Sequence, residues 1–203
     1  HRLDPCIAGI LRAKVDPAIA TTLAGAFECQ RVTKRYFAIV RGHPAEEGSI
    51  DHPLRRQRDP YDARAEPPEQ GNEAPQPALT HFKRLATAEL PHAVDRYPTS
   101  RYALMMLEPV TGRRHQLRRH MKHISHPIIG DATHGKGVHN RFFATCFGVD
   151  RLLLASVHVR FPHPVSNRPM VLTAPPAADF LAVAARLGWS HVIHATLSAP
   201  FDS

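Results

Sequence analysis

The sequence lacks two features that would each place the chain in a particular class of protein. It has no run of about 18 apolar residues, so it predicts no membrane-spanning helix. Its three cysteines are an odd number at unrelated spacings, which argues against a disulfide framework. This cysteine usage favours a reducing compartment such as the cytoplasm.

Acidic residues are also scarce, and the positive charge that results is concentrated in one stretch. The 203 residues include 18 Asp and Glu against 26 Lys and Arg, for a formal net charge of +8. Residues 101–122 hold six basic residues against one acid, hence +5, whereas residues 59–73 hold five acids against one arginine, hence −4. A focused positive charge indicates an anionic partner, most often nucleic acid.

The order of predicted elements indicates one α+β domain over residues 1–203. Strands and helices are interspersed without a strict βαβ alternation, which favours a mixed, mostly antiparallel central sheet flanked by helices and loops. Residues 52–78 are rich in proline and charge, so we expect a flexible surface insertion there. Periodicity and turn residues predict helices over 17–29, 112–124 and from about 177, and strands over 34–42, 79–90, 100–110 and 151–161.

Four short motifs follow one another along the chain: HRLD at residues 1–4, KRYFAIVRG at 34–42, TGRRHQLRRH at 111–120 and HPIIGD at 126–131. The third places arginines around the start of a predicted helix, an arrangement that suits a phosphate or a carboxylate. Taken alone, Asp4 of HRLD is better explained as a turn or cap residue than as a catalytic carboxylate.

Together and in this order, the motifs resemble those of the RluA-type RNA pseudouridine synthases, and the resemblance extends from His1 to about Trp189. It implies the pseudouridine synthase catalytic fold, here N-terminally incomplete, because family members carry a further segment before HRLD. It also implies a cytoplasmic enzyme that acts on tRNA, at the uridine of position 65. The sequence indicates no obligatory protein partner.

The resemblance also implies roles for individual residues. Asp4 matches the catalytic aspartate, Tyr36 lies in the strand that carries the active-site tyrosine, and Arg118 matches the arginine that pairs with the aspartate. Arg2 matches an arginine that fills the gap left by a flipped base. The remaining basic residues of the cluster would hold RNA phosphates: Arg113, Arg114, Arg119 and Lys122.

The chemistry explains why these residue types are needed. Pseudouridine formation breaks the N1–C1′ bond of uridine and rejoins the base through C5, which requires an ionised carboxylate as nucleophile or base. A nearby guanidinium keeps a buried carboxylate charged. The reaction involves no redox change and no group donor, so we expect no cofactor and no metal.

Two other interpretations remain open. Residues 5–9 read PCIAG where the family has Thr-Ser before the glycine, which leaves room for a non-catalytic RNA-binding relative. Four histidines within 12 residues could alternatively bind a metal, with Asp131 the nearby acid, although no cysteine is close: His115, His120, His123 and His126. A metal-dependent nuclease would follow from that second interpretation.

Overall fold

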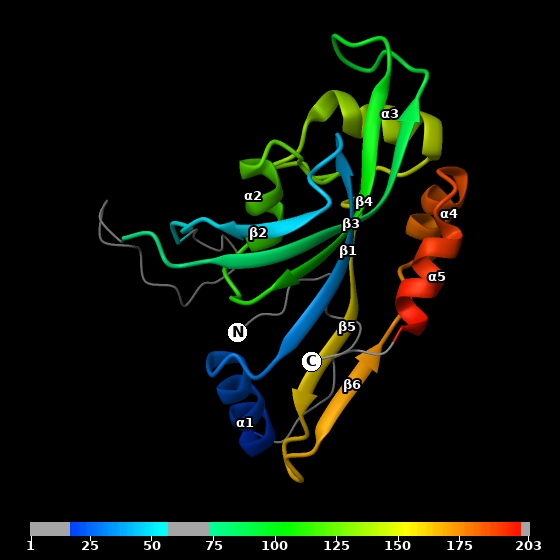
Figure 1. The fold of residues 1–203 in the computed structure, drawn as a ribbon. Helices are drawn as coiled ribbons and strands as arrows, with labels where there is room; N and C mark the ends of the chain where they lie inside the picture. The colour runs from blue at the N-terminus through cyan, green and yellow to red at the C-terminus, as the bar shows by residue number, and fades with distance from the viewer. Residues whose placement is uncertain (1–16, 57–73, 200–203) are drawn as a thin grey trace.

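A six-stranded sheet in the order β2-β3-β4-β1-β5-β6 organises the computed structural model, which describes residues 17–56 and 74–199 (Figure 1). Every pairing between its named strands is antiparallel. The α+β class and the antiparallel character of the sheet are therefore confirmed. The strands are β1 (Thr33–Arg41), β2 (Glu47–Asp51), β3 (Leu79–Leu90), β4 (Ser100–Pro109), β5 (Leu154–Pro162) and β6 (Pro169–Thr173).

Helices pack on both faces of this sheet. One face is covered by α3 (Gly137–Phe147), α4 (Ala178–Arg186) and α5 (Ser190–Ser198), whose apolar residues form one core with Phe37 and Ile39. The opposite face carries α2 (Gln116–His123), which buries Leu117 and Met121 against a second core. The first helix, α1 (Pro17–Glu28), packs on β5 and β6. None of the helices in residues 17–56 and 74–199 is long and apolar enough to cross a membrane.

The helix predicted over 112–124 is shorter than expected and begins at Gln116. Its N-cap, His115, has a left-handed backbone with φ of 54°, so the chain enters the helix through a sharp turn. Four elements were not predicted, namely β2, β6, α3 and α5. Strand β2 is short, polar and at the sheet edge, and α3 opens on a glycine with no side-chain cap, so neither carries a strong local signal.

The ends of the segment 52–78 are anchored in the fold. Leu54 and Gln76 form an isolated antiparallel bridge, and Leu54 and Ala78 are buried. The interior of the segment lies outside the described residues, so its flexibility stays a prediction.

The HPIIGD motif runs beside the end of β1 and requires glycine at residue 130. Ile129 N–H donates to the Ile39 carbonyl, and Leu153 N–H donates to the Ile129 carbonyl. A Cβ atom on Gly130 would lie 1.8 Å from the carbonyl oxygen of Arg151, and its φ is +77°. This close approach fixes the position of the next residue, Asp131.

Candidate active site

Tyr36 lies in the middle of the sheet, on the face that α2 covers. Its strand β1 pairs with β4 and β5, and Tyr36 stands opposite Leu107 and Ser156. The side chain is buried and belongs to the same apolar cluster as Leu117 of α2. The predicted aromatic residue and the predicted arginine helix therefore meet on one face of the sheet.

Gln116 fixes the turn between β4 and α2. Its side-chain oxygen accepts hydrogen bonds from the Thr111 hydroxyl (2.7 Å) and the Arg113 N–H (2.9 Å). Its amide nitrogen donates to the Leu79 carbonyl (2.9 Å) and the Thr80 hydroxyl (3.0 Å). Both donors and both acceptor positions of the amide are thus used, which ties the start of α2 to β3.

Arg118 makes a bidentate ion pair with Asp131. Arg118 Nε donates to Asp131 Oδ2 and Arg118 Nη2 donates to Asp131 Oδ1, each at 2.7 Å. The Asp131 side chain is 0% exposed and that of Arg118 is 14% exposed. The planar guanidinium is therefore held in one orientation by two parallel, charge-assisted hydrogen bonds.

The surroundings of Asp131 keep its carboxylate ionised. Burial opposes ionisation, but Arg118 and the backbone N–H groups of His134 and Thr133 outweigh it and hold the pKa of Asp131 below its ordinary value. Those two N–H groups donate to Oδ1 at 2.8 and 2.9 Å. Asn140 of α3 also bonds this turn, donating to the Asp131 carbonyl and accepting from the Gly130 N–H, both at 2.9 Å.

Sequence reasoning missed the roles of Gln116 and Asp131. It considered Asp131 only as an acid near the histidines, whereas the structure shows it as the partner of Arg118. The available signal was the Gly-Asp pair of HPIIGD, because a short carboxylate commonly caps a tight turn.

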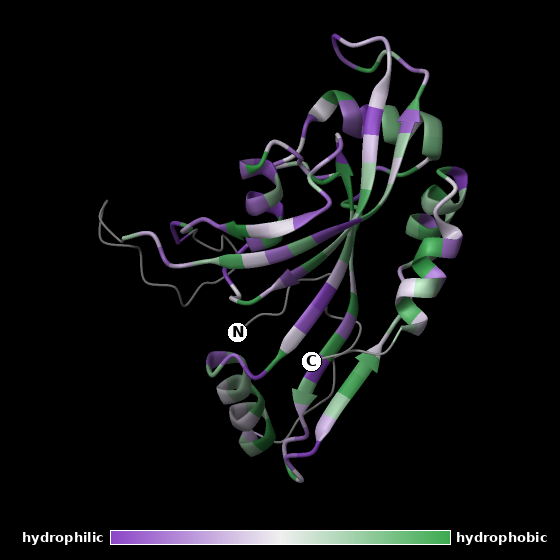
Figure 2. Cartoon of the chain, viewed as in Figure 1, coloured by the Kyte–Doolittle hydropathy of each residue, from purple (hydrophilic) through white to green (hydrophobic). Residues whose placement is uncertain are grey.

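The basic residues of the cluster predicted to bind RNA lie in α2 and in the turn before it, and the residues of α2 are mostly hydrophilic (Figure 2). Arg113 and Lys122 are exposed, and Arg114 and Arg119 are half-buried. Arg113 Nε donates to the Pro77 carbonyl at 3.1 Å and Arg119 Nη1 donates to the Arg55 carbonyl at 2.9 Å. These two arginines therefore also hold the two ends of the segment 52–78.

The histidine cluster is divided among separate contacts. His120 is buried and bonds the Thr80 hydroxyl and the His52 carbonyl, while His123 stacks on the His52 ring at 3.7 Å. His126 Nδ1 bonds the Arg41 carbonyl at 2.8 Å. Within residues 17–56 and 74–199, no three His, Cys, Asp or Glu side chains are arranged to hold a metal ion.

Asp4 and Arg2 lie outside the described residues. The pairing of Asp4 with Arg118 and the base-replacing role of Arg2 therefore stay predictions. The described chain does show that α2, the helix that carries Arg118, packs on the same sheet face as Tyr36, and that Arg118 is paired with Asp131.

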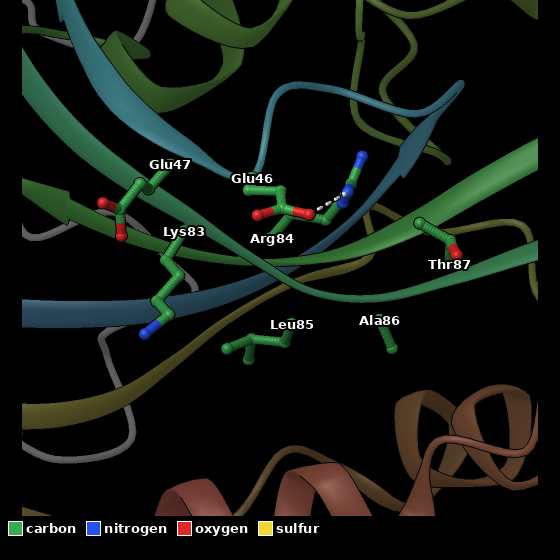
Figure 3. Close-up of a pocket in the computed structure, with 7 residues that line it drawn as sticks. All are labelled: Glu46, Glu47, Lys83, Arg84, Leu85, Ala86 and Thr87. Carbon is green, nitrogen blue, oxygen red and sulfur yellow. Dashed lines mark hydrogen bonds and ion pairs between the residues drawn. The ribbon is translucent and has the colours of Figure 1, made fainter.

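A hollow on the outer part of the sheet is separate from these residues. It is lined by one run of β3, the last residue of the loop before β2 and the first residue of β2, with Arg84 Nη2 bonded to Glu46 Oε1 at 3.3 Å (Figure 3). None of the predicted site residues is among its lining residues: Glu46, Glu47, Lys83, Arg84, Leu85, Ala86 and Thr87.

Comparison with known proteins identifies the class to which this fold and site belong. A family model described as RNA pseudouridylate synthase matches residues 1–123, which include HRLD, β1 and all of α2. The chain belongs to the RNA pseudouridylate synthase family.

Individual relatives agree with that assignment. The tRNA pseudouridine synthase C of Pectobacterium carotovorum subsp. carotovorum is 43% identical over 193 residues, which are 95% of this chain and 50% of the relative. The tRNA pseudouridine synthase C of Yersinia pestis is 41% identical over 192 residues, 95% of this chain and 74% of the relative. The chain thus spans half of the first relative and about three quarters of the second.

Solved structures show the same fold. Human RNA Pseudouridylate Synthase Domain Containing 1 superimposes with a TM-score of 0.59 at 28% identity, over 80% of this chain and 62% of that one. Human RNA Pseudouridylate Synthase Domain Containing 4 gives a TM-score of 0.61 at 21% identity, over 85% and 69%.

The Arg118–Asp131 pair predicts a specific pH dependence of stability. Because the pKa of Asp131 is lowered on folding, its contribution is fully present above the unfolded value of about 4 and is lost as the pH falls below it. We expect Asp131→Asn to lower the free energy of unfolding by about 3–5 kcal/mol at pH 7, because it removes the buried carboxylate that makes the bidentate ion pair with Arg118. The difference from wild type should shrink in urea titrations below about pH 4.

The matched control is Asp179→Asn, which removes the half-exposed partner of Arg151. An exposed pair contributes about 1 kcal/mol or less, so its effect should be small. If the two variants lost equal free energies of unfolding, the larger contribution predicted for the buried Arg118–Asp131 pair would be contradicted.

Proposed function

We propose that this chain carries the catalytic centre of a tRNA pseudouridine synthase that isomerises uridine, with Asp4 as the catalytic carboxylate. The observation that carries the proposal is the convergence of Tyr36 and the fixed Arg118 on one sheet face, in a member of the RNA pseudouridylate synthase family. That the substrate is tRNA follows from relatives named tRNA pseudouridine synthase C. The resemblance further favours position 65 and the cytoplasm, and both described cysteines are free thiols.

In the proposed reaction, Arg118 holds the carboxylate of Asp4 in its charged form. Asp131 uses two of the five N–H donors of the guanidinium and fixes its plane. The Asp4 carboxylate then assists cleavage of the N1–C1′ bond, as a nucleophile or as a base. Because Asp131 already satisfies part of the guanidinium, the arginine cannot swing away from this position.

Tyr36 provides a ring against which the displaced uracil stacks. The base turns and C5 bonds to C1′, while the bond to Asp4 breaks or, where Asp4 acts as a base, the proton that it removed returns to the sugar. The C5 proton then leaves and N1 gains a proton. The Tyr36 oxygen can accept the C5 proton late in this sequence while its own hydroxyl proton passes to solvent. Atoms and electrons balance within the nucleotide, so no cofactor is required.

The basic surface around α2 would hold the RNA backbone while the base is flipped out of its stack. Flipping costs a few kcal/mol, and phosphate contacts together with Arg2 in the vacated space would offset it. Lys122 and Arg113 are the exposed cations of this surface.

Release of tritium from tRNA labelled at uracil C5 tests the function directly. We expect wild type to release tritium and Asp4→Ala to release none, because the carboxylate is required for cleavage of the N1–C1′ bond. If both proteins bind RNA and neither releases tritium, the chain is instead a non-catalytic RNA-binding relative. This is the second candidate function, because the sequence PCIAG at residues 5–9 departs from the family pattern.

The hydroxyl of Tyr36 has its own test. Tyr36→Phe keeps the stacking ring but removes the acceptor, so we expect the rate of tritium release to fall about 100-fold or more with RNA affinity retained. The matched control is Tyr102→Phe, a buried strand tyrosine whose hydroxyl contacts His139 Nδ1 at 2.9 Å. It should lose about 1 kcal/mol of stability and keep the rate. Equal rates for Tyr36→Phe and wild type would rule out the proton-acceptor role.

A further inference from the structure

A buried imidazole beside the Arg118–Asp131 pair has no role in the reaction described above. His134 is 8% exposed, and its Nε2 atom is buried without a hydrogen-bond partner among the described residues. A buried polar atom left unsatisfied costs about 1–3 kcal/mol, so native proteins rarely keep one without a reason. A ligand that binds at this point would remove the cost.

The position of this imidazole is fixed by the same turn that orients Arg118. The His134 N–H donates to Asp131 Oδ1 at 2.8 Å, the oxygen that also accepts from Arg118 Nη2. Its ring meets the His115 ring edge-on, with centroids 5.6 Å apart and an angle of 73°. The backbone of His134 is therefore held by the same carboxylate that orients Arg118, and its ring packs against His115 beside this pair.

The charges around His134 indicate what kind of group it receives. Burial lowers its pKa, and Arg118, Lys122 and Arg119 lower it further against the opposing effect of Asp131. The ring is consequently neutral at pH 7, where an imidazole carries one N–H donor. A neutral donor flanked by three cations matches an anionic oxygen, and the anionic oxygens of RNA are those of its phosphates.

We propose that His134 Nε2–H donates a hydrogen bond to a phosphate oxygen next to the target uridine. The bond would position the nucleotide for Asp4 and Tyr36, so His134 is assigned as a substrate-positioning residue. The proposal rests on the proposed function, because it takes RNA as the ligand of the Arg118 site.

The test uses a hairpin RNA with the sequence of the tRNA stem around uridine 65, and the same hairpin with single methylphosphonate linkages on either side of that uridine. Affinities are measured by fluorescence anisotropy. We expect one of the two linkages to weaken wild-type binding about tenfold, the loss of one charge-assisted hydrogen bond. His134→Leu should bind the unmodified hairpin about tenfold more weakly than wild type does. It should bind the hairpin with that methylphosphonate linkage as tightly as it binds the unmodified one. His134→Gln, which keeps an amide donor, should recover part of the affinity.

The matched control is His139→Leu. His139 is also buried with an unpartnered Nε2 in the described structure, but it contacts Tyr102 on the opposite face of the sheet. It should keep the full methylphosphonate effect of wild type. The proposal is overturned if wild type shows no effect at either linkage, if His134→Leu retains the full effect, or if His139→Leu abolishes it.

Failure of this proposal and failure of the proposed function give different results. If the effect of the methylphosphonate linkage on affinity depends on His134 but wild type releases no tritium from tRNA, the binding contact is supported and the catalytic function is contradicted. Tritium release by wild type without such coupling would contradict only the role of His134.

Discussion

The buried ion pair between Arg118 and Asp131 is the constraint on which the candidate site depends. It joins α2 to the turn before α3 across 13 positions of sequence and holds the guanidinium with two hydrogen bonds of 2.7 Å. Two charges in a buried position are stabilising only when their geometry and remaining hydrogen bonds are satisfied. Here the backbone N–H groups of Thr133 and His134 complete the coordination of the carboxylate.

The rest of the local structure places the two partners of this pair. Gln116 ties the start of α2 to β3, and Gly130 brings Asp131 close to the end of β1 by packing against the Arg151 carbonyl. Leu117 and Met121 then seat the other face of α2 on the sheet beside Tyr36. An arginine held by two hydrogen bonds, on a helix that packs over the sheet face of a buried tyrosine, is a preorganised arrangement of the kind that a reaction dependent on one charged carboxylate needs.

Much of this arrangement could be predicted from the sequence. The alternating side chains of KRYFAIVRG identified the central strand β1. The helical spacing of the apolar residues 117, 121 and 124 identified the buried face of α2. The start of α2 could not be predicted, because it is set by hydrogen bonds from Gln116 to Leu79 and Thr80 of β3, and these residues are distant from Gln116 in sequence. The same holds for Asp131, since a Gly-Asp turn signals a cap but not which arginine the carboxylate will meet.

The most direct measurement is the coupling free energy between residues 118 and 131 in unfolding, from urea denaturation of wild type, Arg118→Met, Asp131→Asn and the double variant. If the pair holds the site together, the double variant should be no less stable than Asp131→Asn, with a coupling of about 2–3 kcal/mol. Additive losses in the double variant would show that the two side chains act independently and would contradict the account.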